Sequence, residues 1–144
     1  MRVARAIAAL LTVVALAAPA FGTAPSSYEV IVNPQSAVQE VDRKFLADAF
    51  LKKLTRWDDE SEVHPVDQPV DSPLRQRFSS EVLERSVSAV KSYWQQHIFS
   101  GRSLPPPELS SDAQVVAYVV EHPGAVGYVS VGADLRGARI LGVR

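Results

Sequence analysis

The chain has 144 residues and 47% hydrophobic content, which suits one globular domain and is short for two. It contains no cysteine, which excludes disulfides, a thiol nucleophile and a lipidated N-terminal cysteine. The formal net charge is −1 and no basic stripe occurs, so we expect no nucleic-acid partner.

The N-terminus has the pattern of a secretory signal peptide. Arg2 and Arg5 precede an apolar run over residues 6–18 that ends in Pro19-Ala20. A transmembrane helix needs about 20 apolar residues, and this run is shorter. We therefore predict a signal peptide over residues 1–20, cleaved after Ala20, with retention as an uncleaved anchor as the alternative.

Residues 21–144 are then a single soluble domain in the periplasm or another extracytoplasmic space, without a membrane span. Residues 1–20 contain two of the 15 Lys and Arg and none of the 16 Asp and Glu. The remainder therefore carries a formal charge of −3. With no cysteine, this domain depends on its apolar core alone for stability.

The first half of this domain predicts a strand, a helix and a second strand. Residues 28–33, "YEVIVN", are rich in β-branched residues and predict a buried strand, and residues 34–41 predict a loop. Asp42 is a suitable N-cap for a helix whose apolar face contains Phe45, Leu46, Ala49 and Phe50. Residues 63–66, "VHPV", predict a short strand, which Pro65 favours at a sheet edge or a strand end.

Two further helices precede a stiff loop. The first runs from Ser72 to about Glu84, and the second is capped by Ser86. The expected buried positions are Leu74, Phe78 and Val82 in the first helix and Val87, Val90, Trp94 and Ile98 in the second. Residues 100–110 contain three consecutive prolines and cannot form a helix.

The C-terminal part predicts a helix followed by two strands. Residues 111–122 form a helix that is apolar on most sides and ends at Pro123-Gly124. Residues 125–131 and 138–143 predict strands joined by a turn. The order β-α-β-α-α-loop-α-β-β predicts an α/β fold with a small mixed sheet flanked by helices.

The residues that could carry chemistry favour structural roles. His64, His97 and His122 lack metal-ligand spacing, and no serine lies in a G-x-S-x-G elbow. The acidic residues of 58–62 predict a solvated turn, with a weak calcium site as the alternative. Trp94 is expected in the core and Trp57 half-buried under this turn. We therefore predict no enzyme, no metal and no cofactor.

Three segments together resemble the phosphate-binding periplasmic proteins. Residues 42–57, "DRKFLADAFLKKLTRW", are similar to the family's "S-x-x-x-L-x-D-I-F-x-G-K-I-T-N-W". Residues 122–129, "HPGAVGYV", are similar to "T-P-G-A-I-G-Y-V". Between them, residues 66–78 take the place of the anion motif "R-x-D-x-S-G-T", with Phe78 six residues after Ser72 as in the family.

The resemblance implies one lobe of a type 2 periplasmic-binding-protein fold. Members of the family are two-lobed and close on an anion in the cleft between the lobes. The similarity covers roughly residues 28 to 131, and no residues are left to build the other lobe. A ligand held from one side only would stay half solvated and bind weakly.

The anion motif has lost most of the groups that would contact phosphate. Gln68 stands in place of the family's arginine, and Val70 in place of its aspartate. The other replacements are Asp71 and Pro73 for glycines and Leu74 for threonine. The glycine of "F-x-G-K" is replaced by Lys52, so we expect that helix end to be capped differently.

Arg75 is the unusual residue of this stretch, because a cation is disfavoured near a helix N-terminus. One explanation is an ion pair with Asp71, four residues earlier, and this is the explanation that we favour. In the other, Arg75 and Ser72 replace the lost arginine and receive an acidic ligand or partner.

Two functions follow from these features. The first is a binding protein with a weak or altered small-anion site made of Ser72, Gln68 and Arg75 and completed by Gly101-Arg102. Phosphate itself is a doubtful ligand of such a site. The second is a ligand-free module that pairs with itself or with another envelope protein through the exposed former cleft face.

Overall fold

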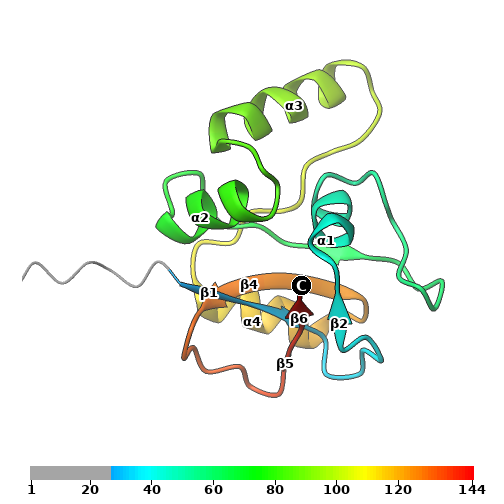
Figure 1. Ribbon diagram of the computed structural model, residues 1–144, viewed down its shortest axis with the longest axis vertical. Coiled ribbons are helices and arrows are strands. Elements are labelled where there is room, and N and C mark those ends of the chain that lie inside the picture. Colours follow the sequence, from blue (N-terminus) through cyan, green and yellow to red (C-terminus); the bar gives the residue numbers. More distant parts are fainter. Residues whose placement is uncertain (1–26) are drawn as a thin grey trace, which may run out of the picture.

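The computed structural model describes residues 27–144, so the predicted signal peptide and its cleavage after Ala20 lie outside the described residues. Within that range the chain forms four helices and six short strands, whose arrangement can be followed in Figure 1. In chain order they are β1 (Tyr28–Val32), β2 (Glu40–Val41), α1 (Arg43–Phe50), β3 (His64–Pro65), α2 (Pro73–Glu81), α3 (Val87–Phe99), α4 (Asp112–Glu121), β4 (Ala125–Ser130), β5 (Arg139–Ile140) and β6 (Gly142–Val143). The predicted α/β class is confirmed.

The main sheet is mixed and has the strand order β3-β4-β1-β5. β1 pairs antiparallel with β4, placing Val30 opposite Tyr128, while β3 runs parallel to β4. β3 is an edge strand, as Pro65 predicts, because proline has no N–H to donate to a second neighbour.

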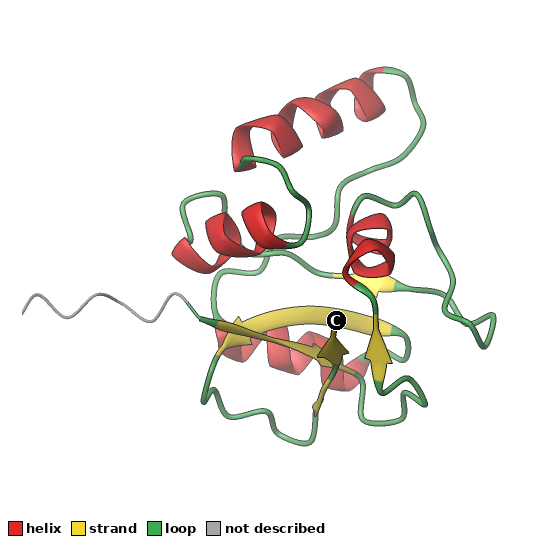
Figure 2. Cartoon of the chain, viewed as in Figure 1, coloured by secondary structure: helices red, strands yellow, loops and turns green. Residues whose placement is uncertain are grey.

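Alternating side chains of the two central strands form two separate cores. Val30, Val32, Val126 and Tyr128 belong to a cluster with residues of α1, α2 and α3. Ile31 and Val129 belong to a second cluster with residues of α4. Successive side chains of a strand point to opposite faces, so β1 is apolar on both sides. Figure 2 shows α4 on one side of the sheet and the other three helices on the opposite side.

Each helix begins at a side-chain cap. Asp42, Ser72 and Ser86 cap α1, α2 and α3 as predicted, and each accepts the backbone N–H three residues later. Ser111 caps α4 in the same way. These caps fix the first turn of every described helix, including the turn that contains Ser72.

The C-terminal strand prediction is wrong in detail. The segment 138–143 forms two strands, of which β5 extends the main sheet beside β1. β6 instead pairs in parallel with β2, which lies inside the segment 34–41 predicted as a loop. Strands of two residues are too short for their periodicity to be visible in a sequence.

Three further expectations are corrected. Trp57 is buried rather than half-buried, because its Nε1–H donates to the Gly124 carbonyl at 3.0 Å and its ring stacks on Phe45. Lys52 does not change the helix end, because it adopts the left-handed conformation (φ 52°) that glycine favours. Of the four expected apolar positions of α3, only Val90 and Trp94 are buried.

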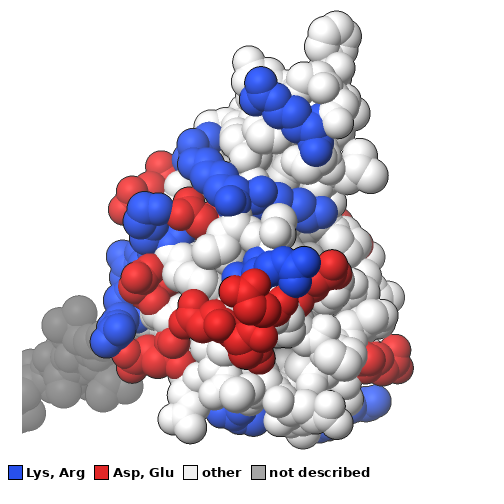
Figure 3. Space-filling model, turned by 90° about the vertical axis from the view of Figure 1, so that its right-hand side faces the viewer, with Lys and Arg blue, Asp and Glu red and all other residues white. Residues whose placement is uncertain are grey.

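Charge is unevenly distributed over the surface. On the face seen in Figure 3, acidic side chains gather around the middle of the molecule, and the upper end shows only basic and uncharged residues. That end contains α3, which lies farthest from the sheet in Figure 1. None of the helices within residues 27–144 has the length and apolarity to cross a membrane.

Candidate functional site

Three of the predicted site residues, Gln68, Ser72 and Arg75, lie where β3 leads into α2. Ser72 has an extended backbone, its Oγ accepts the Arg75 N–H at 3.4 Å, and Pro73 occupies the first helical position. Proline is favoured at this position because its missing N–H would have no partner in the helix. The predicted start of α2 at Ser72 is therefore confirmed.

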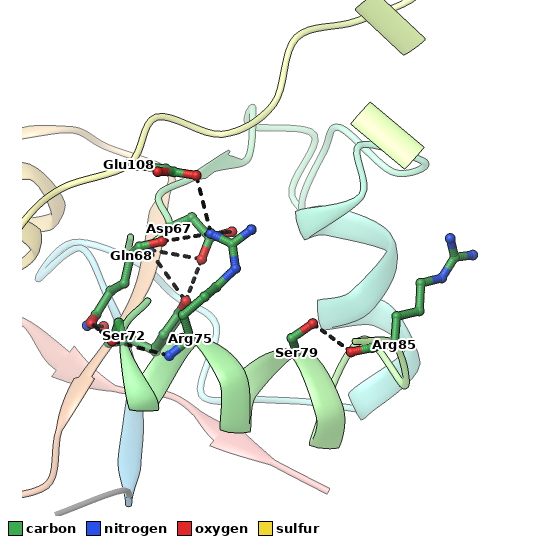
Figure 4. A network of polar contacts seen from close by, with 8 residues as sticks. Asp67, Gln68, Ser72, Arg75, Ser79, Arg85 and Glu108 are labelled. Atoms are coloured by element: carbon green, nitrogen blue, oxygen red, sulfur yellow. Dashed lines mark hydrogen bonds and ion pairs between the residues drawn. The ribbon is translucent and has the colours of Figure 1, made fainter. Parts of the chain in front are cut away.

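Arg75 points into the protein rather than toward solvent. It is only 4% exposed, and its Nη1 lies 2.9 Å from Asp67 Oδ2 and donates to the Gln68 carbonyl at 2.7 Å. Glu108 Oε1 lies 3.6 Å from the same nitrogen. Figure 4 shows the guanidinium between these three residues. The preferred pairing with Asp71 is therefore wrong, and so is the alternative of an Arg75 that is open to a ligand.

Asp67 is the reason for this arrangement. It lies two residues after β3 and is nearly inaccessible to water, where an ionised carboxylate requires a counter-charge. Its Oδ1 accepts hydrogen bonds from the Tyr128 hydroxyl and from the Gln68 N–H, while Oδ2 faces Arg75. Burial raises the pKa of the Asp67 carboxyl, and the Arg75 charge opposes this shift. Burial, with the nearby Asp67 charge, likewise raises the pKa of Tyr128.

The Gln68 side chain is fully engaged by the protein itself. Its Nε2 donates to the Tyr128 carbonyl at 2.9 Å and to Asp112 Oδ1 at 3.2 Å. Its Oε1 accepts the Ser72 hydroxyl proton at 2.9 Å. Both amide protons and the Ser72 hydroxyl proton are therefore already committed.

The proline-rich loop reaches this network at Glu108 and not at Arg102. The Asp67 N–H donates to the backbone carbonyl of Pro107, and the Leu109 N–H donates to the backbone carbonyl of Asp67, each at 2.9 Å. Arg102 follows the end of α3, where its N–H donates to the His97 carbonyl at 3.0 Å. The structure thus brings together Ser72, Gln68 and Arg75, without Gly101-Arg102.

Four members of the network are not predicted by the sequence: Asp67, Glu108, Asp112 and Tyr128. Asp67 could have been found, because a carboxylate directly after a predicted strand needs a partner. Glu108, Asp112 and Tyr128 had no comparable indication, since their contacts with the network depend on how distant segments pack. Among the described residues, one buried side-chain nitrogen lacks a hydrogen-bond partner, Arg75 Nε.

The network offers fixed charges and dipoles but no arrangement for covalent chemistry. The Ser72 hydroxyl donates to an amide oxygen and not to a base. Within residues 27–144, no group of three His, Asp or Glu residues could hold a metal ion. All residues of the acidic turn 58–62 are exposed, in agreement with a solvated turn. Within this turn the Ser61 N–H donates to Asp59 Oδ1.

Comparison with known proteins identifies the fold. An ABC-type phosphate transport receptor from Vibrio cholerae superposes with a TM-score of 0.63 at 17% identity, covering 81% of this chain and 45% of the receptor. PstS from Borrelia burgdorferi gives a TM-score of 0.63 at 12% identity, covering 81% of this chain and 47% of PstS. No family model and no curated protein matches the sequence.

The resemblance drawn from the three sequence segments is confirmed at the level of the fold. The chain spans less than half the length of these structures, which agrees with a single lobe. Both structures are of binding proteins rather than enzymes.

Proposed function

We propose that this chain is an exported, non-enzymatic interaction module that keeps the fold of one phosphate-receptor lobe without its phosphate site. The main supporting observation is that the Ser72 hydroxyl donates to Gln68, and that Arg75 Nη1 donates to the Gln68 carbonyl and pairs with Asp67. Among the buried side-chain nitrogens and oxygens of this described network, only Arg75 Nε has no hydrogen-bond partner. These contacts support the second of the two functions expected from the sequence over the anion-binding one.

The charges around Arg75 argue against an anionic ligand. Asp67 and Glu108 already face its Nη1, and Asp112 contacts Gln68. A phosphate would have to displace a buried carboxylate 2.9 Å from the guanidinium and approach two further carboxylates. Each of these steps costs free energy, because the site has a low dielectric and like charges repel.

The surface near the start of α2 is the proposed contact face for a protein partner, which is a second copy or another envelope protein. In the matching receptors more than half of each chain lies outside the superposed part. Val70, which replaces the family's aspartate, is 48% exposed beside this turn. An exposed apolar side chain beside polar groups that are already bonded within the protein is better suited to binding a protein surface than to binding a small anion.

Calorimetry tests the ligand part of this proposal. The full chain is titrated with phosphate, sulfate and small carboxylates, and we expect no binding tighter than millimolar. Micromolar binding of any of them would contradict the proposal.

Site-specific photo-crosslinking tests the partner. A photoreactive amino acid is placed at Val70 and, as the control, at Val131, which has a similar exposed fraction of 53%. We expect adducts from position 70 and none from position 131. A strictly monomeric protein without adducts at position 70 would refute the interaction module.

A further inference from the structure

The C-terminal end of α3 exposes a group of large apolar side chains. Phe99 is 97% exposed, and Ile98 and Leu104 are also exposed. We call residues 98–104 the α3 tip. The core contacts of α3 are made farther back along the helix by Val90 and Trp94, so these three side chains have no part in the core.

The α3 tip has a fixed backbone. Gly101 has a left-handed conformation (φ 67°), and its N–H donates to the Ile98 carbonyl at 3.1 Å. The Arg102 N–H donates to the His97 carbonyl at 3.0 Å, which completes a Schellman motif. The apolar side chains and Arg102 are therefore presented together on an ordered turn.

The segment around the α3 tip has no acidic residue. Residues 85–107 contain Arg85, Lys91 and Arg102 but no Asp or Glu, although the chain has 16 acidic residues. Figure 3 shows the same feature, because the upper end of that face carries basic and uncharged side chains only. The α3 tip combines exposed apolar side chains with nearby positive charges and no negative ones within residues 85–107. It is therefore complementary to a surface whose outer layer is negatively charged and whose inner layer is apolar.

We propose that the α3 tip docks on a lipid bilayer that contains anionic phospholipids. Phe99, Ile98 and Leu104 enter the boundary between head groups and acyl chains, while Arg102 and Lys91 bind lipid phosphates. Aromatic and basic side chains are the types favoured at this depth. A second copy is a poorer occupant, since a symmetric contact would bring the two Arg102 guanidinium groups toward each other.

The α3 tip shares no residue with the proposed contact face near the start of α2, which we call the α2 face. Membrane docking is therefore tested independently of the proposed function. A failed crosslink at Val70 leaves membrane docking untouched, and a failed vesicle assay leaves the α2 face untouched.

Fluorescence of a Phe99→Trp variant of the full chain tests the docking directly. The native Trp57 and Trp94 are buried and give a constant background. With vesicles containing phosphatidylglycerol we expect a blue-shifted emission that brominated lipids quench, and no shift with pure phosphatidylcholine. An unchanged emission, or an equal change with both lipids, would overturn the proposal. A blue shift that appears with protein concentration alone would also overturn it, because it indicates self-association.

Vesicle flotation with matched variants gives a second test. Ile98→Ser and Phe99→Ser should each weaken binding to the anionic vesicles by about tenfold, as expected for the loss of one inserted apolar side chain. The control is Ile140→Ser, because Ile140 is 54% exposed and Ile98 is 50% exposed. The apolar run of residues 6–18 is the same in every variant, so a difference between variants reports on the tip. Equal binding of Ile98→Ser and Ile140→Ser would refute the role of the tip.

Discussion

At the residue scale, the Arg75 guanidinium stabilises the fold by neutralising a carboxylate that has almost no contact with water. Asp67 faces Arg75 at 2.9 Å, and both side chains are nearly inaccessible. Removing one member of such a pair leaves an uncompensated charge in a low dielectric, which costs more than the pair itself contributes.

A double-mutant cycle measures this coupling. Arg75→Met and Asp67→Leu should each lower the free energy of unfolding by about 3–5 kcal/mol, and the double variant by much less than the sum. The control is Arg77→Met on the same helix, whose exposed Glu81 pair should contribute below about 1 kcal/mol. Urea unfolding gives all four values. Additive single effects would show that Asp67 and Arg75 act independently.

Lys52 adopts a left-handed backbone conformation that is favourable for glycine but strained for a residue with a Cβ atom. Its φ of 52° lies in the left-handed region, and its N–H donates to the Ala49 carbonyl at 3.1 Å. Lys52→Gly should therefore raise the free energy of unfolding by about 0.5–1 kcal/mol. Lys52→Ala retains the Cβ atom and should give no comparable gain. If the two variants have equal stability, the strain does not exist.

Tyr28 gives the protein an alkaline stability limit. Burial and its hydrogen bond to Glu81 raise the pKa of Tyr28 to about 12, above an unfolded value near 10.0. The stabilisation is therefore complete below about pH 10 and lost as the pH rises toward 12. Between about pH 9 and 11, wild type should lose at most about 1 kcal/mol relative to Tyr28→Phe, because solvent screens the interactions of a partly exposed side chain. A difference that stays constant over this range in denaturant unfolding would contradict the assignment.

At the element scale, α4 packs against the sheet at a glycine. A Cβ atom on Gly127 would lie 2.8 Å from Val115 Cγ1 and 2.9 Å from Val66 Cγ2. These distances are shorter than real contacts allow, so a side chain at this position would push α4 away from β4. The second glycine of "HPGAVGYV" therefore has a packing role in this lobe.

The Gly127→Ala variant tests this packing. We expect it to lower the free energy of unfolding by about 1–3 kcal/mol through overpacking. Adding Val115→Ala removes the opposing methyl group, so the double variant should cost less than the two single changes together. Thermal unfolding of the three variants is sufficient. Strict additivity would mean that Val115 does not limit the approach of α4.

The helices were more predictable than the strands because their indicators are local. Caps such as Asp42 and Ser86 lie within three residues of the N–H groups that they bind. β2 and β6 contain two residues each and are stabilised by pairing across about a hundred residues of sequence, which no local pattern contains. The same holds for the residues of the site. The sequence predicts Ser72 correctly as the N-cap of α2, because capping is local. It does not predict that Arg75 pairs with Asp67, because this pair depends on the burial of Asp67 in the folded protein.

At the scale of the whole molecule, one lobe has its own two cores without any disulfide. The chain contains no cysteine, and the sheet separates the α1–α3 cluster from the α4 cluster. Neither cluster needs residues from a second lobe to cover its face of the sheet. The central claim is that this lobe has the receptor fold but does not bind phosphate, because the polar groups at the start of α2 other than Arg75 Nε are bonded within the protein.

Thermal unfolding of the full chain in phosphate tests this claim most directly. A site with micromolar affinity would stabilise the protein by about 4 kcal/mol at a thousandfold excess of phosphate over the dissociation constant. That gain would raise the melting temperature by many degrees. We predict the same melting temperature in phosphate as in chloride of equal ionic strength. A phosphate-dependent increase that is lost in a Ser72→Ala variant would contradict the account.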